Sequence, residues 1–161
     1  MVNVVQISLD SFDLKILQVL QEDARITMLD LAAQVGLSAT PCARRVKRLE
    51  DEGLIDRYVT LLNAERLGLG LTVFVNVRLN SQVPKSFETF EAAIQRMPEV
   101  VGCYLLAGQY DYLVQVRVAN VEAYRDLIRE RLIAIEGVAE TQSSIVLEQT
   151  KHTTALPVPI I

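Results

Sequence analysis

The side chains that could carry out chemistry are few, and they favour binding over catalysis. The two cysteines, Cys42 and Cys103, lie far apart in the sequence, and His152 is the only histidine. So small a set at that spacing disfavours a zinc site or a nucleophile paired with a histidine base. The sequence contains no G-x-S-x-G, P-loop or H-E-x-x-H motif. We therefore expect no catalytic residue, no bound metal and no cofactor.

A cluster of basic residues offers the clearest binding chemistry. Between Ser38 and Leu49 the sequence carries no acid and four cations, which are Arg44, Arg45, Lys47 and Arg48. The whole chain of 161 residues holds 16 Lys+Arg against 20 Asp+Glu, for a net charge of −4. Because an acidic chain is not drawn to nucleic acid by bulk charge, the cluster would have to attract phosphates locally. The alternative is that the cluster is simply the solvated face of a helix.

The elements around the cluster predict a helix-turn-helix. Asp10 can cap a first helix, with Asp13 as its N3 residue and an apolar face at helical spacing. A second helix begins after Thr27 and ends at Gly36, which can take a positive φ. The third helix, Ser38–Glu52, carries the cluster. In such a pair of helices joined by a short glycine-containing turn, the second helix is the one that reads DNA.

The segment after the third helix alternates in polarity. Gly53–Leu61 is typical of a short two-stranded wing, which would add Arg57 to the basic side. Val46 and Leu49 would face the core of the domain and leave the cations mostly outward. Cys42, beside the turn, is expected to be a small packed residue; a redox-sensing thiol is the alternative. Capped helices, glycine turn, basic helix and wing together favour DNA binding over a merely solvated surface.

The second half of the chain alternates strand and helix patterns. Strands are expected at 72–80, 100–106, 112–118 and 138–148, with helices after Pro84 and after Asn120. The order βαββαβ is that of a ferredoxin-like sheet with both helices on one face. Strand residues such as Phe74, Val114 and Val116 would leave apolar surface on the other face. A second copy of the chain would cover that surface in a two-fold dimer.

These patterns predict an α+β protein with two domains. Residues 1–62 would form the winged helix-turn-helix domain, 63–70 a hinge, 71–150 the ferredoxin-like domain and 151–161 an extended C-terminal tail. No apolar run is long enough to span a membrane. Met1–Gln6 lacks the features of a signal peptide. We therefore expect a cytoplasmic protein with no membrane partner.

Several motifs together resemble one family. Leu37–Glu50, Glu52–Ile55, Leu61–Asn63 and Gly108–Tyr112 are similar to segments of the Lrp/AsnC (feast/famine) transcriptional regulators. The resemblance covers roughly residues 9–155 and is closest to the leucine-responsive branch. It implies an N-terminal domain that binds double-stranded DNA and a C-terminal domain that senses an amino acid. It also implies homodimers that join into higher rings, often octamers, and a bacterial or archaeal protein associated with the nucleoid.

For DNA, the third helix would enter the major groove. Its first residues would lie nearest the base edges, and these are Ser38, Ala39, Thr40 and Pro41. Arg44 and Arg45 would reach bases or phosphates. Lys47, Arg48 and Arg57 would contact phosphates, which position a protein on DNA without specifying the sequence.

For the effector, the resemblance points to the G-x-x-D hairpin, at the interface between dimers. Gly108 would let a ligand carboxylate approach backbone N–H groups, and Asp111 would pair with its α-ammonium. The flanking residues would be Leu106, Ala107 and Tyr110, with Thr141 and Ser143 from the facing strand. Ala107 and Gln109 depart from the polar or acidic residues common in the family, which leaves the identity of the effector open. An amino acid like leucine or methionine is expected; a plain turn is the alternative.

Two other functions match parts of the sequence. An architectural DNA-compacting protein without small-molecule control would share the basic helix and the oligomer. An enzyme built on a ferredoxin-like domain would need a catalytic constellation, and the sequence offers none beyond Asp111. We therefore expect a DNA-binding regulator whose oligomeric state or DNA affinity responds to an amino acid.

Overall fold

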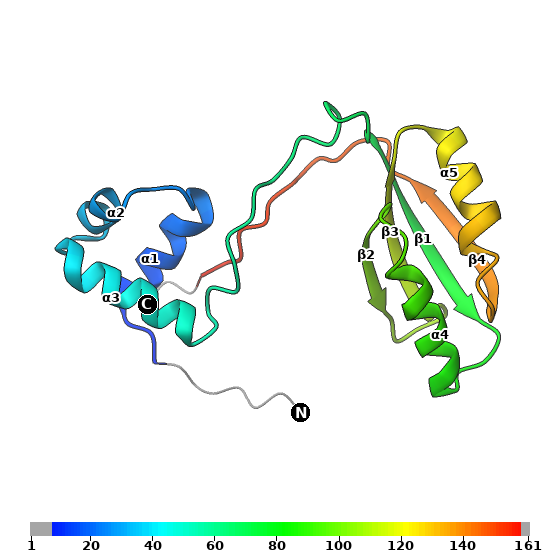
Figure 1. Cartoon of the computed structure of the whole chain (residues 1–161), viewed down its shortest axis with the longest axis horizontal. Coiled ribbons are helices and arrows are strands. Elements are labelled where there is room, and N and C mark those ends of the chain that lie inside the picture. The colour runs from blue at the N-terminus through cyan, green and yellow to red at the C-terminus, as the bar shows by residue number, and fades with distance from the viewer. Residues whose placement is uncertain (1–7, 159–161) are drawn as a thin grey trace. The chain divides into compact units, whose positions relative to one another are not determined.

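The computed structural model describes residues 8–158, which form two compact units (Figure 1). The first unit comprises the chain up to Leu61 together with the tail from Lys151, and the second is Leu62–Thr150. Met1–Gln6 and the tail beyond Val158 lie outside the described residues. Among the described residues, no helix has the length and apolar character needed to cross a membrane.

Three helices build the first unit, and they are α1 (Ser11–Glu22), α2 (Met28–Val35) and α3 (Ala39–Asp51). Asp10 caps α1 in a reciprocal capping box: its carboxylate accepts from the Asp13 N–H, and the Asp13 carboxylate accepts from the Asp10 N–H. Thr27 caps α2 by accepting from the N–H of Asp30. Gly36 ends α2 in the left-handed conformation, with a φ of 77°. The predicted caps of both helices are confirmed.

The core of the first unit lies where the three helices meet. Ile16 comes from α1, Leu31 and Val35 from α2, and Val46 and Leu49 from α3. All five side chains are buried, and burial of apolar area of this kind drives the helices together. The inward placement of the two α3 side chains is as predicted, so the core determines which face of α3 is turned away from solvent.

The segment after α3 differs from the prediction. Within the described chain, residues 56–62 form no strand, so the two-stranded wing over Gly53–Leu61 is absent. A two-stranded wing needs turn residues between its strands. Gly53, the only glycine of this segment, has a φ of 72° directly after α3 and so supplies no turn further along. Arg57 is exposed in this segment and pairs with its neighbour Asp56 at 3.4 Å.

The second unit contains a four-stranded antiparallel sheet in the order β2-β3-β1-β4. Its strands are β1 (Leu71–Leu79), β2 (Val100–Leu105), β3 (Tyr112–Val118) and β4 (Val138–Ile145). Its helices are α4 (Pro84–Ile94) and α5 (Val121–Leu127), and α5 continues as a π-helical turn over Ile128–Leu132. The element order confirms the ferredoxin-like prediction.

Both helices pack on one face of the sheet (Figure 1), where the core of the second unit lies. Val114 and Val116 are fully buried on this face, so the prediction that they line the uncovered face is wrong. Period-two alternation shows which strand residues share a face, but not which face the helices cover. Phe74 does lie on the uncovered face, between the buried Val73 and Val75 of β1.

The extended tail belongs to the first unit, although it follows the sheet in sequence. The Leu156 N–H donates to Oε1 of Gln21 on α1 at 2.6 Å, and the Leu156 carbonyl accepts from Gln21 Nε2 at 3.2 Å. One side-chain amide therefore satisfies both backbone polar groups of a single residue. The tail is held against the first helix of the chain.

Candidate functional sites

The four cations of α3 divide into two pairs that differ in burial and in their partners. Arg44 and Lys47 are exposed, whereas Arg45 and Arg48 are half-buried. Residues three apart share one side of a helix, so each pair forms its own stripe. The nearest acid to Lys47 is Asp51, one turn later at 3.6 Å, and the Lys47 side chain is 76% exposed. Such a surface pair is weak, so the outward stripe remains available to a partner.

The inward pair converges on one carboxylate of α1. Arg45 Nη1 donates to Asp13 Oδ1 at 2.8 Å, and Arg48 Nη2 donates to Asp13 Oδ2 at 2.6 Å. Asp13 is only 1% exposed. The ring of Phe12 lies 5.4 Å from the guanidinium carbon of Arg45 and adds a cation–π contact. These contacts tie α3 to the beginning of α1.

Asp10 completes this cluster at the surface, where its Oδ2 accepts from Arg45 Nη1 at 2.7 Å. The hydrogen bond from the Asp13 N–H, assisted by Arg45, holds the pKa of Asp10 below its usual value. The two carboxylates in turn raise the pKa of Arg45. In the sequence, Asp10 and Asp13 are recognisable only as helix-capping residues. The missed signal is that Asp13 lies one turn before the buried Ile16, where a charged side chain needs a partner.

The predicted DNA-contacting residues are therefore not all equivalent. Thr40, Arg44 and Lys47 are exposed and follow one another at helical spacing along α3. Ser38 is exposed at the N-cap, and its side chain makes no capping hydrogen bond. Ala39 and Pro41, beside it, are half-buried, and Arg57 lies beyond the helix. The structure thus gathers polar side chains along one side of α3 and holds the other two cations, Arg45 and Arg48, against α1.

Both cysteines have a raised pKa. Cys42 is fully buried, as predicted for a packed residue, and burial raises the pKa of its thiol although Arg45 acts in the opposite direction. Burial and the charge of Glu91 raise the pKa of Cys103 to about 11. The thiolate is the reactive form of cysteine, so neither environment favours redox sensing.

We expect the native protein at neutral pH to react slowly with the thiol reagent 5,5′-dithiobis(2-nitrobenzoate), because both thiols stay protonated and partly or fully covered. After denaturation, both cysteines should react within the mixing time. Absorbance of the released thionitrobenzoate measures the rate. A Cys103→Ser variant, which leaves Cys42 alone, assigns any residual reaction. A fast native reaction in that variant would contradict the packed role of Cys42.

The hairpin 106–111 joins β2 to β3, and a buried acid anchors its end. Asp111 is 7% exposed. Its Oδ2 accepts from the Leu79 N–H at 2.7 Å, and its Oδ1 accepts from Gln82 Nε2 at 3.0 Å. Its own N–H donates to the Val77 carbonyl at 2.9 Å. The Asp111 carboxylate is thus engaged by β1 and the loop after it, and its pairing with a ligand ammonium stays a prediction.

The tip of the hairpin is open. Ala107 and Gly108 are exposed, and Leu106 is 39% exposed. Within residues 8–158, the N–H groups of 107–110 donate to no acceptor of the chain. A Cβ at Gly108 would meet no atom within 4 Å, and Gly108 is not among the glycines with positive φ. Nothing within the described chain therefore requires glycine at this position.

The β4 residues predicted to face the hairpin have different surroundings. Thr141 and Ser143 lie opposite Val77 and Val75 of β1, so they point to the side of the sheet that the helices cover. The Ser143 hydroxyl is hydrogen-bonded to the Tyr124 hydroxyl of α5. β1 separates β4 from β3. Among the predicted hairpin residues, it is Tyr110 whose hydroxyl reaches β4, donating to Glu140 Oε1 at 3.5 Å.

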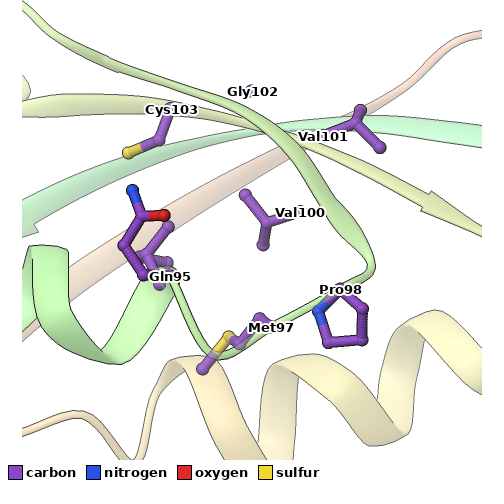
Figure 2. A pocket seen from close by; sticks show the side chains of 8 residues that line it. Gln95, Met97, Pro98, Val100, Val101, Gly102 and Cys103 are labelled. Atoms are coloured by element: carbon purple, nitrogen blue, oxygen red, sulfur yellow. The ribbon is translucent and has the colours of Figure 1, made fainter.

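A pocket of about 320 Å³ lies elsewhere in the second unit, between the end of α4 and the beginning of β2 (Figure 2). Met97, Pro98 and Val100 line it together with Gln95 and Cys103, whose side chains lie near each other in the figure. None of the residues predicted to bind an effector lines this pocket. It is at the start of β2, whereas the hairpin follows the end of that strand.

Comparisons with known proteins match both units. The winged helix-turn-helix DNA-binding family matches residues 9–56, and the Lrp/AsnC ligand binding domain matches residues 72–156. The leucine-responsive regulatory protein of Salmonella typhimurium is 44% identical over 148 residues, which cover 92% of this chain and 90% of that protein.

Two solved structures are similar along nearly the whole chain. A transcriptional regulator from Neisseria meningitidis in complex with L-methionine is 42% identical, with a TM-score of 0.90, over 93% of this chain and 97% of that chain. A feast or famine regulatory protein from M. tuberculosis complexed with L-methionine is 31% identical, with a TM-score of 0.81, over 94% and 100%. These relatives are regulatory proteins rather than enzymes.

Proposed function

The chain belongs to the Lrp/AsnC family of transcriptional regulators, and from this membership we propose that α3 reads DNA and that the hairpin 106–111 senses an amino acid. As a member, it is a DNA-binding regulator with an amino-acid ligand-binding domain and not an enzyme. The observation that carries the DNA-reading role is the exposed stripe of Thr40, Arg44 and Lys47 on α3.

In this proposal the beginning of α3 lies in the major groove of double-stranded DNA. Ser38 and Thr40 present hydroxyl groups to base edges, because short polar side chains at the start of a reading helix reach them. Arg44 and Lys47 contact phosphates and supply the attraction that a chain of net charge −4 does not supply as a whole. Arg57, exposed beyond α3, adds a phosphate contact.

The effector site that we propose is the open tip of the hairpin. Its N–H groups have no acceptor within the described chain, and a row of free N–H groups can receive a carboxylate. The space beside Gly108 allows close approach. Two similar structures hold L-methionine, and the Salmonella typhimurium relative is named for its response to leucine. Methionine and leucine are therefore the effectors that we propose.

Assembly of several copies of the chain would connect effector binding at the hairpin with DNA binding by α3. The uncovered sheet face carries Phe74, with Tyr104 and Leu113 paired across β2 and β3. We propose that a second copy covers this face in a dimer and that dimers join into a ring, an octamer by the family resemblance. An effector bound between dimers changes assembly or DNA affinity only if it binds the two states unequally. The protein would act in the cytoplasm, where a bacterial or archaeal cell keeps its DNA.

A thermal-shift screen over the twenty amino acids, repeated by size-exclusion chromatography, tests this proposal. Methionine and leucine should raise Tm, because a ligand at 100 times its Kd stabilises the folded state by about 2.7 kcal/mol. They should also change the elution volume. A Gly108→Val variant is the matched control, because it fills the open space beside the N–H groups and should abolish the shift. If no amino acid raises Tm, the architectural DNA-compacting function is favoured instead.

A further inference from the structure

We infer that Asp13 is a positioning residue for DNA recognition, which holds Arg45 and Arg48 so that α3 presents one fixed stripe to the duplex. The inference rests on the proposed role of α3 as the reading helix. Asp13 itself is buried and would not touch DNA. It would act through the orientation of the helix and through the number of cations left free to bind phosphates.

The contacts of Asp13 are numerous for a single carboxylate. It accepts from Arg45, from Arg48 and from the Asp10 N–H at 2.8, 2.6 and 3.1 Å. Both arginines are distant in sequence, 32 and 35 residues away. Every one of these bonds joins the first turn of α1 to α3 or closes the α1 cap. The beginning of α1 and the middle of α3 are therefore fixed to each other at two points.

The two contacts with Asp13 restrict rotation of α3 about its own axis more tightly than apolar packing does. Val46 and Leu49 determine which face of α3 is buried, but methyl contacts tolerate small rotations of a helix about its own axis. Hydrogen bonds to base edges do not, because they weaken steeply with misalignment. A carboxylate that binds Arg45 and Arg48, one turn apart, resists such a rotation. Thr40, on the same helix, then keeps a constant direction.

Stability alone does not account for this cluster. Buried ion pairs can often be replaced by apolar side chains of similar volume without loss of stability, because desolvation offsets the attraction. The cluster also withholds two of the four cations of α3 from DNA. With Arg45 and Arg48 bound to Asp13, Arg44 and Lys47 are the two cations of this set that make no ion pair to α1 within the described residues. Asp13 therefore limits the sequence-independent part of binding, which favours discrimination between sequences.

The test is the Asp13→Asn variant, which keeps the shape of the side chain and removes its charge. Binding is measured by fluorescence anisotropy against two duplexes: one selected by the wild-type protein from a random pool, and one scrambled from it. We expect the preference for the selected duplex to fall about tenfold, as it does when one good base contact is removed. The released arginines should steepen the plot of log K against log salt by up to about 1.8. This corresponds to about tenfold more affinity lost between 50 and 200 mM salt.

A Glu22→Gln variant is the charge control, because Glu22 is exposed on the same helix and has no ion pair within the described residues. It should leave both the slope and the preference unchanged. Should Asp13→Asn fail to fold by circular dichroism, Arg48→Gln decides. The Gln amide can still donate to Asp13 but carries no charge, so Asp13 keeps a partner on α3. Because Asp13 already keeps Arg48 away from the phosphates, the slope should remain that of the wild-type protein.

The outcomes separate this inference from the proposed function. A folded Asp13→Asn protein with unchanged slope and preference overturns the inference, and so does equal weakening on both duplexes at unchanged slope, which marks a merely structural role. Where Arg48→Gln decides, a slope flattened by about 0.9 overturns the inference, because it shows that Arg48 contacts a phosphate. If the wild-type protein itself shows no salt-dependent binding to either duplex, the reading role of α3 fails instead.

Discussion

Replacing both Arg44 and Lys47 by glutamine is expected to weaken DNA binding roughly sixtyfold at 0.1 M salt and to flatten the salt dependence by about 1.8 in slope. The reason is counterion release. For each phosphate that the protein no longer neutralises, the plot of log K against log salt becomes less steep by about 0.9, and log K at 0.1 M salt falls by about 0.9. Both side chains are exposed and neither joins the core of the first unit. Tm should therefore stay within a few degrees. Anisotropy titrations over a salt series give the slope.

The matched control for this double variant is Lys85→Gln with Arg129→Gln. It makes the same change in net charge at two exposed cations of the second unit. Its slope and affinity should be those of the wild-type protein. A double Arg44, Lys47 variant that keeps the wild-type slope would show that α3 does not contact phosphates through its outward stripe.

Replacing Asp111 by alanine is expected to abolish the response to methionine and leucine. The buried N–H of Leu79 loses its acceptor, and an unsatisfied buried donor costs about 1–3 kcal/mol. Gln82 loses its partner too, so the end of the hairpin is no longer held to β1. The first unit keeps all of its own contacts, and DNA binding below the unfolding temperature should persist. Thermal shift with each amino acid and anisotropy with DNA measure the two effects separately.

The Asp111→Asn variant shows which part of the side chain matters. The amide keeps one oxygen to accept from Leu79 but carries no charge. If Asp111 only holds the hairpin, Asn should retain a measurable thermal shift with the amino acids. If its charge pairs with the α-ammonium of the effector, Asn should be as unresponsive as Ala. A wild-type shift in the alanine variant would refute the hairpin as the effector site.

Local signals in the sequence predict most of the fold. Asp10, Thr27 and Asn120 are caps that precede helices, and each accepts a backbone N–H as expected. Gly36 and Gly137 follow helical segments and have positive φ. These features depend on neighbours within a few residues, so spacing alone reveals them. The order of strands and helices follows from the same local patterns.

The structure differs from the prediction where a residue's surroundings depend on residues far away in the sequence. The buried side of β3 depends on where α4 and α5 pack, so alternation alone places Val114 and Val116 on the wrong face. In the same way, Asp13 and its two arginines are separated by more than thirty positions. Sequence spacing indicates a charged helix face in α3. It does not show that half of the cations on that helix are already bound by α1.

For the candidate effector site, too, the sequence indicates the segment but not its contacts with distant residues. The resemblance indicates the hairpin, and the structure adds that Asp111 is bound by Leu79 and Gln82. That arrangement depends on β1 lying beside β3, which no local motif reveals. The glycine at 108 can be noticed in the sequence, but the open space around it depends on the fold, in which a Cβ there would meet no atom of the described residues within 4 Å.

The pairing of Leu156 with Gln21 returns the end of the described chain to the first unit. The first unit is discontinuous: the chain leaves it at Leu61, forms the whole second unit, and re-enters at Lys151. The second unit is thus an inserted domain, joined to its host by two covalent connections. A fragment that stops at Leu61 would lack the returning segment that hydrogen-bonds to Gln21 on α1. The two connections enter the first unit at different places. One leads to the residues that follow α3, and the other leads to the segment that binds α1.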